Sequence, residues 1–247
     1  MNFLSLFKRK ILYKLKRKIN IDLDNINYKS LDELFYYYGS DKANIFKHTN
    51  KKGHGFSSFY TSYLKSLKSK KINILEIGSF AGASAAAFVK YFPYSNIYCF
   101  DVNISNFIYS SRKIHVHGLN INNEKKLNEI LEKLNFENNL DYFDVIIDDG
   151  SHNLSDILIG LKLLFKYVKK DGFYIIEDFK HPNYYQYNRN TKHILVDEFL
   201  KNLENKKFFN SSIINKENQK YLMNVINKID TYKGNLIDSD ICFIKKK

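Results

Sequence analysis

The sequence predicts an α/β fold with a doubly wound, mostly parallel sheet, and three observations support this prediction. Strand-like and helix-like segments alternate from residue 72 onward, a pattern typical of β-α-β units. The segment 72–84, INILEIGSFAGAS, reads as a strand, a glycine turn and the start of a helix. Acidic residues end three later strand-like runs: Asp101, Asp148 with Asp149, and Glu177 with Asp178. Ligands bind outside the carboxyl ends of parallel strands, so we expect these acids to line one crevice.

The individual elements follow from local patterns. Ser30 and Glu33 form a capping-box sequence that opens a short helix through Tyr38, and residues 59–67 look helical. The expected strands are 72–77, 96–101, 114–117, 143–148 and 172–177. The expected later helices are 82–91, 123–134, 153–168 and 193–206. The last run, 240–245, is expected to be an antiparallel edge strand. The predicted class is therefore Rossmann-like, with an antiparallel edge strand and an N-terminal helical extension.

Length and composition indicate a globular chain with a sizeable core, since 44% of the 247 residues are hydrophobic. We expect residues 1–70 to form a basic amphipathic helix and a helical cap, and residues 71–247 to form the domain that carries the chemistry. Cys99 and Cys242 lie in apolar runs and read as buried, reduced thiols. The sequence shows no signal peptide and no apolar stretch near the roughly 18 residues that span a membrane. These features predict a cytoplasmic location.

The net charge of +13 is concentrated in the two tails. Residues 1–20 hold seven Lys or Arg residues and no acid, and residues 245–247 add three lysines. No nucleic-acid partner is expected, because the body of the chain is nearly neutral. Residues 1–20 also carry an apolar stripe at helical spacing, formed by Leu4, Phe7, Ile11, Leu15 and Ile19. Two interpretations stay open. In the first, the helix lies on the anionic inner surface of a membrane. In the second, it packs on its own domain or on a partner subunit of a homo-oligomer.

The glycine turn predicts a ligand site. Gly78 and Gly82 frame it, and glycine allows positive φ and the close approach of a ligand. The spacing matches neither a dinucleotide fingerprint nor a phosphate-cradling loop. Asp101 ends the next strand, where a carboxylate can bind both hydroxyls of a ribose. Glu76 is a charged residue in an otherwise apolar strand, where an unpaired carboxylate would be unfavourable.

The later acids predict a metal site. Several carboxylates at one crevice repel one another unless a cation neutralises them, and oxygen ligands without cysteine favour Mg²⁺ or Mn²⁺. His152 follows Asp149 by three residues and suits the role of general base. The alternative is structural: Asp149 or Ser151 caps the helix that begins near residue 153, and Glu177 and Asp178 are exposed charges.

These motifs resemble those of a known superfamily. LEIGSFAGAS followed by IYCFD is similar to the first two motifs of class I S-adenosylmethionine-dependent methyltransferases. Five further features resemble the metal-dependent sugar O-methyltransferases of macrolide and polysaccharide biosynthesis: Gly39–Lys42, Tyr91–Pro93, Asp148–His152, Ile176–Phe179 and the terminal DSDICFIKK. The resemblance covers about residues 38–246. It implies that Gly78 and Gly82 approach the amino-acid end of S-adenosylmethionine, and that Asp101 holds its ribose.

The resemblance also assigns the remaining residues. Similarity to catechol-type methyltransferases implies a metal-ligand acid and a base three residues apart, which favours Asp149 as ligand and His152 as base. Glu177 and Asp178 are expected as further ligands because the carboxylates converge at one crevice. Asp148 is then grouped with the cofactor-binding residues or orients its neighbour. Leu119 stands where the family carries an acid that contacts the adenine, so adenine recognition is expected at Asn120 or at backbone groups.

The expected function is that of an S-adenosylmethionine-dependent O-methyltransferase assisted by Mg²⁺ or Mn²⁺. Its acceptor would be a sugar hydroxyl, in a nucleotide sugar or a surface-polysaccharide unit. His181 and Tyr184–Tyr187 are expected to form a substrate lid, or to pack their loop onto the body. One alternative is an NAD-dependent oxidoreductase, which leaves Asp149, Glu177 and Asp178 unexplained. Another is a non-catalytic module that binds a membrane or RNA through residues 1–20.

Overall fold

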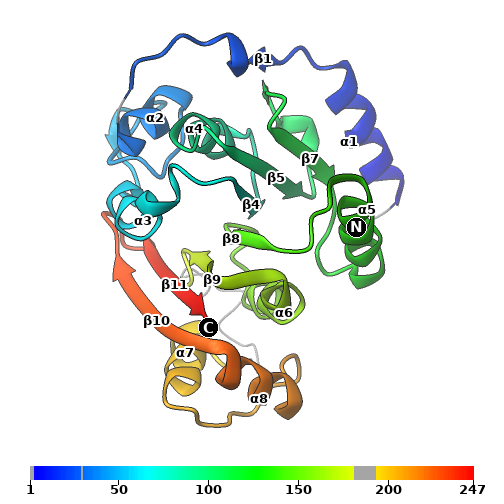
Figure 1. The fold of residues 1–247 in the computed structure, drawn as a ribbon, viewed down its shortest axis with the longest axis vertical. Coiled ribbons are helices and arrows are strands. Elements are labelled where there is room, and N and C mark those ends of the chain that lie inside the picture. Colours follow the sequence, from blue (N-terminus) through cyan, green and yellow to red (C-terminus); the bar gives the residue numbers. More distant parts are fainter. Residues whose placement is uncertain (1–2, 29, 181–192) are drawn as a thin grey trace. The chain divides into compact units, whose positions relative to one another are not determined.

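In the computed structural model, the described residues are 3–28, 30–180 and 193–247. The chain divides into two compact units (Figure 1). The first unit comprises residues 1–120 and 234–237, and the second comprises residues 121–233 and 238–247. Both units contain parallel strands connected through helices, which confirms the predicted α/β class. Among the residues that the structure describes, no helix combines the length and the apolar character needed to cross a membrane.

The sheet strands of the first unit are parallel. Strand β5 (Ser95–Asp101) lies between β4 (Ile72–Ile77) and β7 (Ile114–Gly118). Most residues of β4 and β5 are buried, as expected of parallel strands that are covered on both faces. Helix α4 (Ala83–Tyr91) connects them and buries three successive alanines, whose small side chains allow close packing. The strand–turn–helix that was predicted from residue 72 is therefore confirmed.

Two helices of the first unit pack on α4. The predicted capping box opens α2 (Leu31–Tyr38): Glu33 N–H donates to Ser30 Oγ, and Ser30 N–H donates to Glu33 Oε2. Helix α3 (Ser57–Leu64) continues into a 3₁₀ turn, Lys65–Leu67. The rings of Phe35 and Tyr60 each lie 5.4 Å from that of Phe88, so aromatic contacts join these helices. A hairpin of β2 (Ile45–Phe46) and β3 (Lys51–Lys52) lies between them in sequence.

The N-terminal helix α1 (Phe3–Leu15) packs on its own unit. It contacts β7 and the 3₁₀ turn Ile104–Asn106, and Figure 1 shows it alongside β7. The chain after it forms the short strand β1 (Ile19–Asn20), which pairs in parallel with β6 (Tyr109–Ser110), and then a 3₁₀ turn, Ile21–Leu23. The helix therefore packs on its own unit, and contact with a membrane stays a prediction.

The second unit contains parallel and antiparallel strands. Strand β8 (Phe143–Asp148) is parallel to β9 (Val168–Glu177), and β11 (Asp240–Lys246) is antiparallel to β9. The last strand is thus antiparallel, as expected. It is not outermost, however, because β10 (Ile226–Lys233) pairs along its other side. Neither β10 nor the preceding helix α8 (Lys216–Val225) is predicted by the sequence patterns.

The helices of the second unit differ from their expected bounds. Helix α5 (Glu124–Asn138) is longer than expected and ends at Asn139 in the left-handed conformation. Helix α6 (Leu154–Leu164) is shorter, because a 3₁₀ turn, Phe165–Tyr167, leads directly into β9. Helix α7 (Val196–Glu204) begins three residues late. None of these shifts moves the strand ends that carry the acids.

Candidate functional site

The glycine turn after β4 depends on left-handed backbone. Gly78 and Gly82 have φ values of 84° and 80°, which side-chain-bearing residues rarely adopt. A Cβ atom at Gly82 would lie 2.3 Å from the ring of Phe107, so no other residue fits there. Gly82 is also the N-cap of α4 and supplies no side-chain hydrogen bond. A helix N-terminus of this kind directs N–H groups and a partial positive charge toward an anionic ligand.

Asp101 is held at this turn by its backbone neighbours. Its Oδ2 accepts a hydrogen bond from Phe80 N–H at 2.8 Å, and its Oδ1 accepts one from Asn103 N–H at 2.5 Å. Each carboxylate oxygen keeps a further lone pair for a ligand. The group is therefore oriented before any ligand binds, as a ribose-binding carboxylate should be.

Of the remaining expected cofactor residues of the first unit, Glu76 lies in β4 and Asn120 follows the end of β7. Glu76 is completely buried in β4, opposite Cys99 of β5. Burial, and secondarily the charge of Glu76, raise the pKa of the Cys99 thiol well above its usual value. Leu119, which stands where the family carries an adenine-binding acid, is buried and donates its N–H to the carbonyl of Asp101. Asn120 follows it and is half-buried.

Three side chains of the second unit form a cluster suited to a cation. Ligand atoms of Asp149, His152 and Asp178 all lie within 4.8 Å of one another. His152 Nε2 is 3.7 Å from Asp149 Oδ1. The cluster forms because β8 and β9 run in parallel, so the residues that follow them meet at one edge. Two carboxylates and an imidazole fit Mg²⁺ or Mn²⁺ better than a thiolate-preferring metal.

Glu177 does not belong to this cluster, although it was expected beside Asp178. It is the last residue of β9 and is buried. Successive side chains of an extended strand point to opposite faces, so adjacent residues do not normally reach one site. Its role as a metal ligand stays a prediction.

Unusual backbone conformations coincide with the candidate site. His152 and Asp178 have φ values of 53° and 48°, and Phe80 has a φ of 44°. A non-glycine residue in the left-handed region costs on the order of 1–3 kcal/mol and persists where its surroundings require it. Two members of the acidic cluster and the residue that binds Asp101 thus share this feature. Asn50, Asn139, Asp171 and Lys206 also have positive φ, so this conformation accompanies the site and does not by itself identify it.

Asp148 packs inside the second unit rather than in the cluster. It is 4% exposed, and the Tyr174 hydroxyl donates to its Oδ2 at 3.1 Å. Burial raises the pKa of Asp148 to about 7, although hydrogen bonds from Tyr174 and from the backbone of Gly150 act in the opposite direction. Helix α6 approaches it closely at Gly160, where a Cβ atom would lie 2.8 Å from Asp148 Oδ2. The side chain is placed to support the loop that carries Asp149.

The capping alternative for Asp149 is not what the structure shows. Asn153 is the N-cap of α6, and its side chain accepts a hydrogen bond from Ser155 N–H at 3.1 Å. Ser151 Oγ accepts the N–H of Asn153 and donates to Asp156. Asp149 is therefore not the residue that begins the helix.

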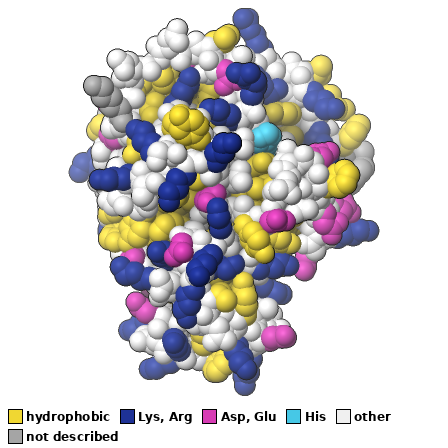
Figure 2. Space-filling model, in the orientation of Figure 1, with side chains coloured by type: hydrophobic (Ala, Val, Ile, Leu, Met, Phe, Trp, Pro, Cys, Tyr) yellow, Lys and Arg dark blue, Asp and Glu magenta, His cyan; other side chains and the backbone are white. Residues whose placement is uncertain are grey.

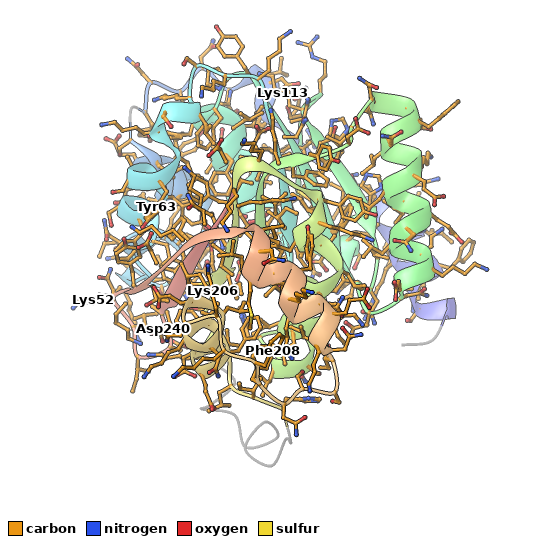
Figure 3. All side chains as sticks on the ribbon, turned by 60° about the horizontal axis from the view of Figure 1, so that its bottom comes forward. Lys52, Tyr63, Lys113, Lys206, Phe208 and Asp240 are labelled. Atoms are coloured by element: carbon orange, nitrogen blue, oxygen red, sulfur yellow. The ribbon has the colours of Figure 1, made fainter. Side chains whose placement is uncertain are left out.

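Several neighbouring residues were not identified from the sequence. Tyr174 gave no signal, because a tyrosine in an apolar strand reads as core. Asp240, labelled in Figure 3, is buried at the start of β11 and pairs with Lys233 at 3.0 Å and Lys180 at 3.7 Å. The expected lid residues His181 and Tyr184–Tyr187 lie outside the described residues.

Comparison with known proteins identifies relatives over part of the chain. No protein-family model matches it. It is 26% identical over 132 residues to mycinamicin VI 2''-O-methyltransferase of Micromonospora griseorubida, covering 51% of this chain and 31% of that protein. It is 29% identical over 155 residues to L-olivosyl-oleandolide 3-O-methyltransferase of Streptomyces antibioticus, covering 60% and 36%. The match thus spans about a third of the length of these relatives.

A solved structure shares the fold. The MycE methyltransferase, solved in complex with Mg, SAH and mycinamycin VI, aligns with a TM-score of 0.67 at 20% identity. The alignment covers 89% of this chain and 55% of MycE. A second structure of MycE, with Mg and SAH, gives a TM-score of 0.65 at 21% identity. The chain therefore has a Rossmann-like methyltransferase fold, and the comparisons confirm the resemblance to sugar O-methyltransferases.

Proposed function

We propose that this protein is an S-adenosylmethionine-dependent O-methyltransferase that acts on a sugar hydroxyl with the assistance of Mg²⁺ or Mn²⁺. The observation that carries the proposal is the cluster of Asp149, His152 and Asp178 after two parallel strands. The relatives named above support it, since one is a mycinamicin VI 2''-O-methyltransferase and the other acts on L-olivosyl-oleandolide, which carries a sugar. We also propose a cytoplasmic location and, as acceptor, a nucleotide sugar or a surface-polysaccharide unit. A homo-oligomer stays a prediction.

The first unit supplies the cofactor residues in this proposal. S-adenosylmethionine, when bound, provides an electrophilic methyl group. Gly78 and Gly82 admit its amino-acid end to the backbone, and the N-terminus of α4 attracts its carboxylate. The preoriented carboxylate of Asp101 accepts hydrogen bonds from the ribose hydroxyls. We assign Asn120 to the adenine and Glu76 to a supporting position of the cofactor site. Asp148 belongs to the second unit, and its place among the cofactor-binding residues stays a prediction.

The second unit supplies the acceptor-side residues. A divalent cation, when bound, would lower the pKa of an acceptor hydroxyl. Asp149 and Asp178 provide the carboxylates to hold it, because their oxygens already lie together with His152. The imidazole of His152 accepts the proton of the acceptor hydroxyl, and the neighbouring charge of Asp149 stabilises the imidazolium that forms. The NAD-dependent alternative is less favoured, because it gives none of these three side chains a role.

The test is a pair of binding measurements followed by an activity assay. Calorimetric titration should show binding of S-adenosylmethionine and no comparable binding of NAD. Mg²⁺ or Mn²⁺ should bind the wild type and not the Asp149→Asn variant, whereas Asp141→Asn, an acid of the same unit outside the cluster, should leave metal binding unchanged. Chelation should abolish methyl transfer to a panel of nucleotide sugars, and added Mg²⁺ should restore it. NAD binding without S-adenosylmethionine binding would overturn the proposal.

A further inference from the structure

Helix α1 presents its apolar stripe to solvent. Phe7, Ile11 and Leu15 follow one another at intervals of four residues, so they share one face of the helix. Their exposed fractions are 56%, 43% and 78%. A surface helix of a globular protein normally turns such a stripe toward the core. In α1 the apolar stripe faces outward.

Polar side chains attach the opposite face of α1 to the first unit. Arg9 Nη1 donates to the carbonyl of Val102 at 2.8 Å. Lys16 Nζ donates to the carbonyls of Ser105 and Asn106 at 3.0 and 3.2 Å. Tyr13 lies between them on the helix, and its ring meets that of Phe107 edge-on. These contacts fix the rotation of the helix, so the outward direction of the stripe is part of the fold.

The charge around the apolar stripe indicates which kind of partner would bind it. Residues 1–20 contain seven basic residues and no acid, and Lys8, Lys10 and Lys14 are exposed on α1. Figure 2 shows hydrophobic and basic side chains side by side at the upper right, where Figure 1 draws α1. Apolar side chains enter the acyl boundary of a bilayer while flanking lysines reach its anionic headgroups. A second copy of the same helix would instead bring like charges together.

We propose that α1 is an interfacial anchor that docks this protein on an anionic lipid surface. The apolar stripe supplies the buried area, and the lysines supply the attraction to the lipid headgroups. RNA is a poorer partner, because phosphate contacts would leave the stripe in water. The proposal concerns a face of the first unit outside the proposed methyl-transfer residues, so it stands or falls separately from the proposed function.

The stripe is tested by vesicle flotation. Wild-type protein should float with vesicles of phosphatidylcholine and phosphatidylglycerol, and much less with phosphatidylcholine alone. The double variant Phe7→Glu and Ile11→Glu should bind the anionic vesicles at least about tenfold more weakly. The matched control is Phe136→Glu, an apolar residue that is 91% exposed on α5, and it should bind like the wild type. Equal binding of wild type and double variant would overturn the proposal.

The flanking charge is tested by a second pair of variants. Replacing Lys8, Lys10 and Lys14 by Gln should weaken binding at least about tenfold, and added salt should weaken wild-type binding. The control replaces Lys206, Lys207 and Lys216, which are exposed elsewhere in the chain, and should have little effect. S-adenosylmethionine affinity and the unfolding temperature should stay unchanged in every variant. The proposal would be overturned if the wild type formed a dimer that the double variant does not form and bound no vesicles. It would also be overturned if the wild type bound RNA and no vesicles.

Discussion

The glycine turn of the first unit and the acidic cluster of the second differ in what holds them in place. Backbone fixes the turn: Gly78 and Gly82 are left-handed, and both oxygens of Asp101 accept backbone N–H groups. In the cluster, the carboxylates of Asp149 and Asp178 lie within 4.8 Å of each other. Like charges at that distance repel each other, so a bound cation would stabilise the cluster. The single carboxylate of the turn is stabilised by backbone N–H groups and needs no cation.

This difference divides the expected effects of mutation. The turn is already arranged for a ligand, so changes in it should alter affinity and leave the rate at saturation nearly constant. The cluster holds the groups that move a proton, so changes in it should alter kcat and leave cofactor affinity nearly constant. Kinetic and binding measurements on matched variants separate the two regions.

The largest effect is expected at His152. His152→Ala should lower kcat by about 10²–10⁴-fold, because the general base is lost, with the affinity for S-adenosylmethionine unchanged. The pH profile of kcat should also lack an ionisation that the wild-type profile shows. His193→Ala is a control in the same unit, since His193 lies near Ser212 instead. Near-normal turnover of His152→Ala would mean that the metal alone activates the acceptor, and that His152 is only a turn residue.

A smaller effect is expected at Asp101. Asp101→Ala should weaken S-adenosylmethionine binding at least tenfold, because charge-assisted hydrogen bonds to the ribose contribute about 1.5–3 kcal/mol each. Titration calorimetry measures the affinity, and saturating cofactor should restore kcat. Asp101→Asn should be intermediate, since its amide oxygen can still accept one backbone N–H. An unchanged affinity would show that Asp101 only stabilises the turn.

The sequence predicts the first region better than the second. The strand, turn and helix around Gly78 follow from local signals, namely a short apolar run, two glycines and a helical pattern. Asp101 and Asp148 could be placed because each ends such a run. Whether Glu177 or Asp178 joins the acidic cluster depends on the exact end of β9, because the end of the strand decides the face to which each side chain points. Tyr174 as the partner of Asp148 needed the three-dimensional packing.

Other features depend on tertiary contacts that leave little local trace. Helix α8 and strand β10 are rich in polar residues, so their periodicity is weak, and β10 is specified by its pairing with β11. The apolar stripe of α1 was evident from its spacing, but its direction was not. That direction is set by Arg9 and Lys16, which bind backbone carbonyls about ninety residues away in the chain.

The support beneath the cluster can be tested through the pH dependence of stability. The pKa of Asp148 is raised to about 7 in the folded protein, against about 3.9 in an unfolded chain. Between these values the folded state keeps a proton that the unfolded state has lost. Stability should therefore fall as pH rises from about 4 to 7, by up to about 1.4 kcal/mol per pH unit, and level off above.

Asp148→Asn removes this titration while keeping an acceptor for the Tyr174 hydroxyl. The difference in unfolding free energy between wild type and variant, measured by urea denaturation without metal, should therefore shrink or reverse as pH rises. Asp141→Asn, an exposed acid of the same unit that is not among the groups acting on Asp148, is the control, and its stability should vary with pH as that of the wild type does. Parallel curves for wild type and Asp148→Asn would show that Asp148 titrates normally in the fold.

The smallest effect is expected at Gly160, where α6 meets Asp148. Alanine favours the helix by roughly 0.5–1 kcal/mol, but its Cβ would lie 2.8 Å from Asp148 Oδ2 and 3.2 Å from the Tyr174 hydroxyl. Overpacking of this kind costs about 1–3 kcal/mol, so Gly160→Ala should destabilise the protein by about 1 kcal/mol. In an Asp148→Ala background the shortest of these contacts is absent, so the same substitution should destabilise the protein less. An equal effect in both backgrounds would show that Gly160 does not position Asp148.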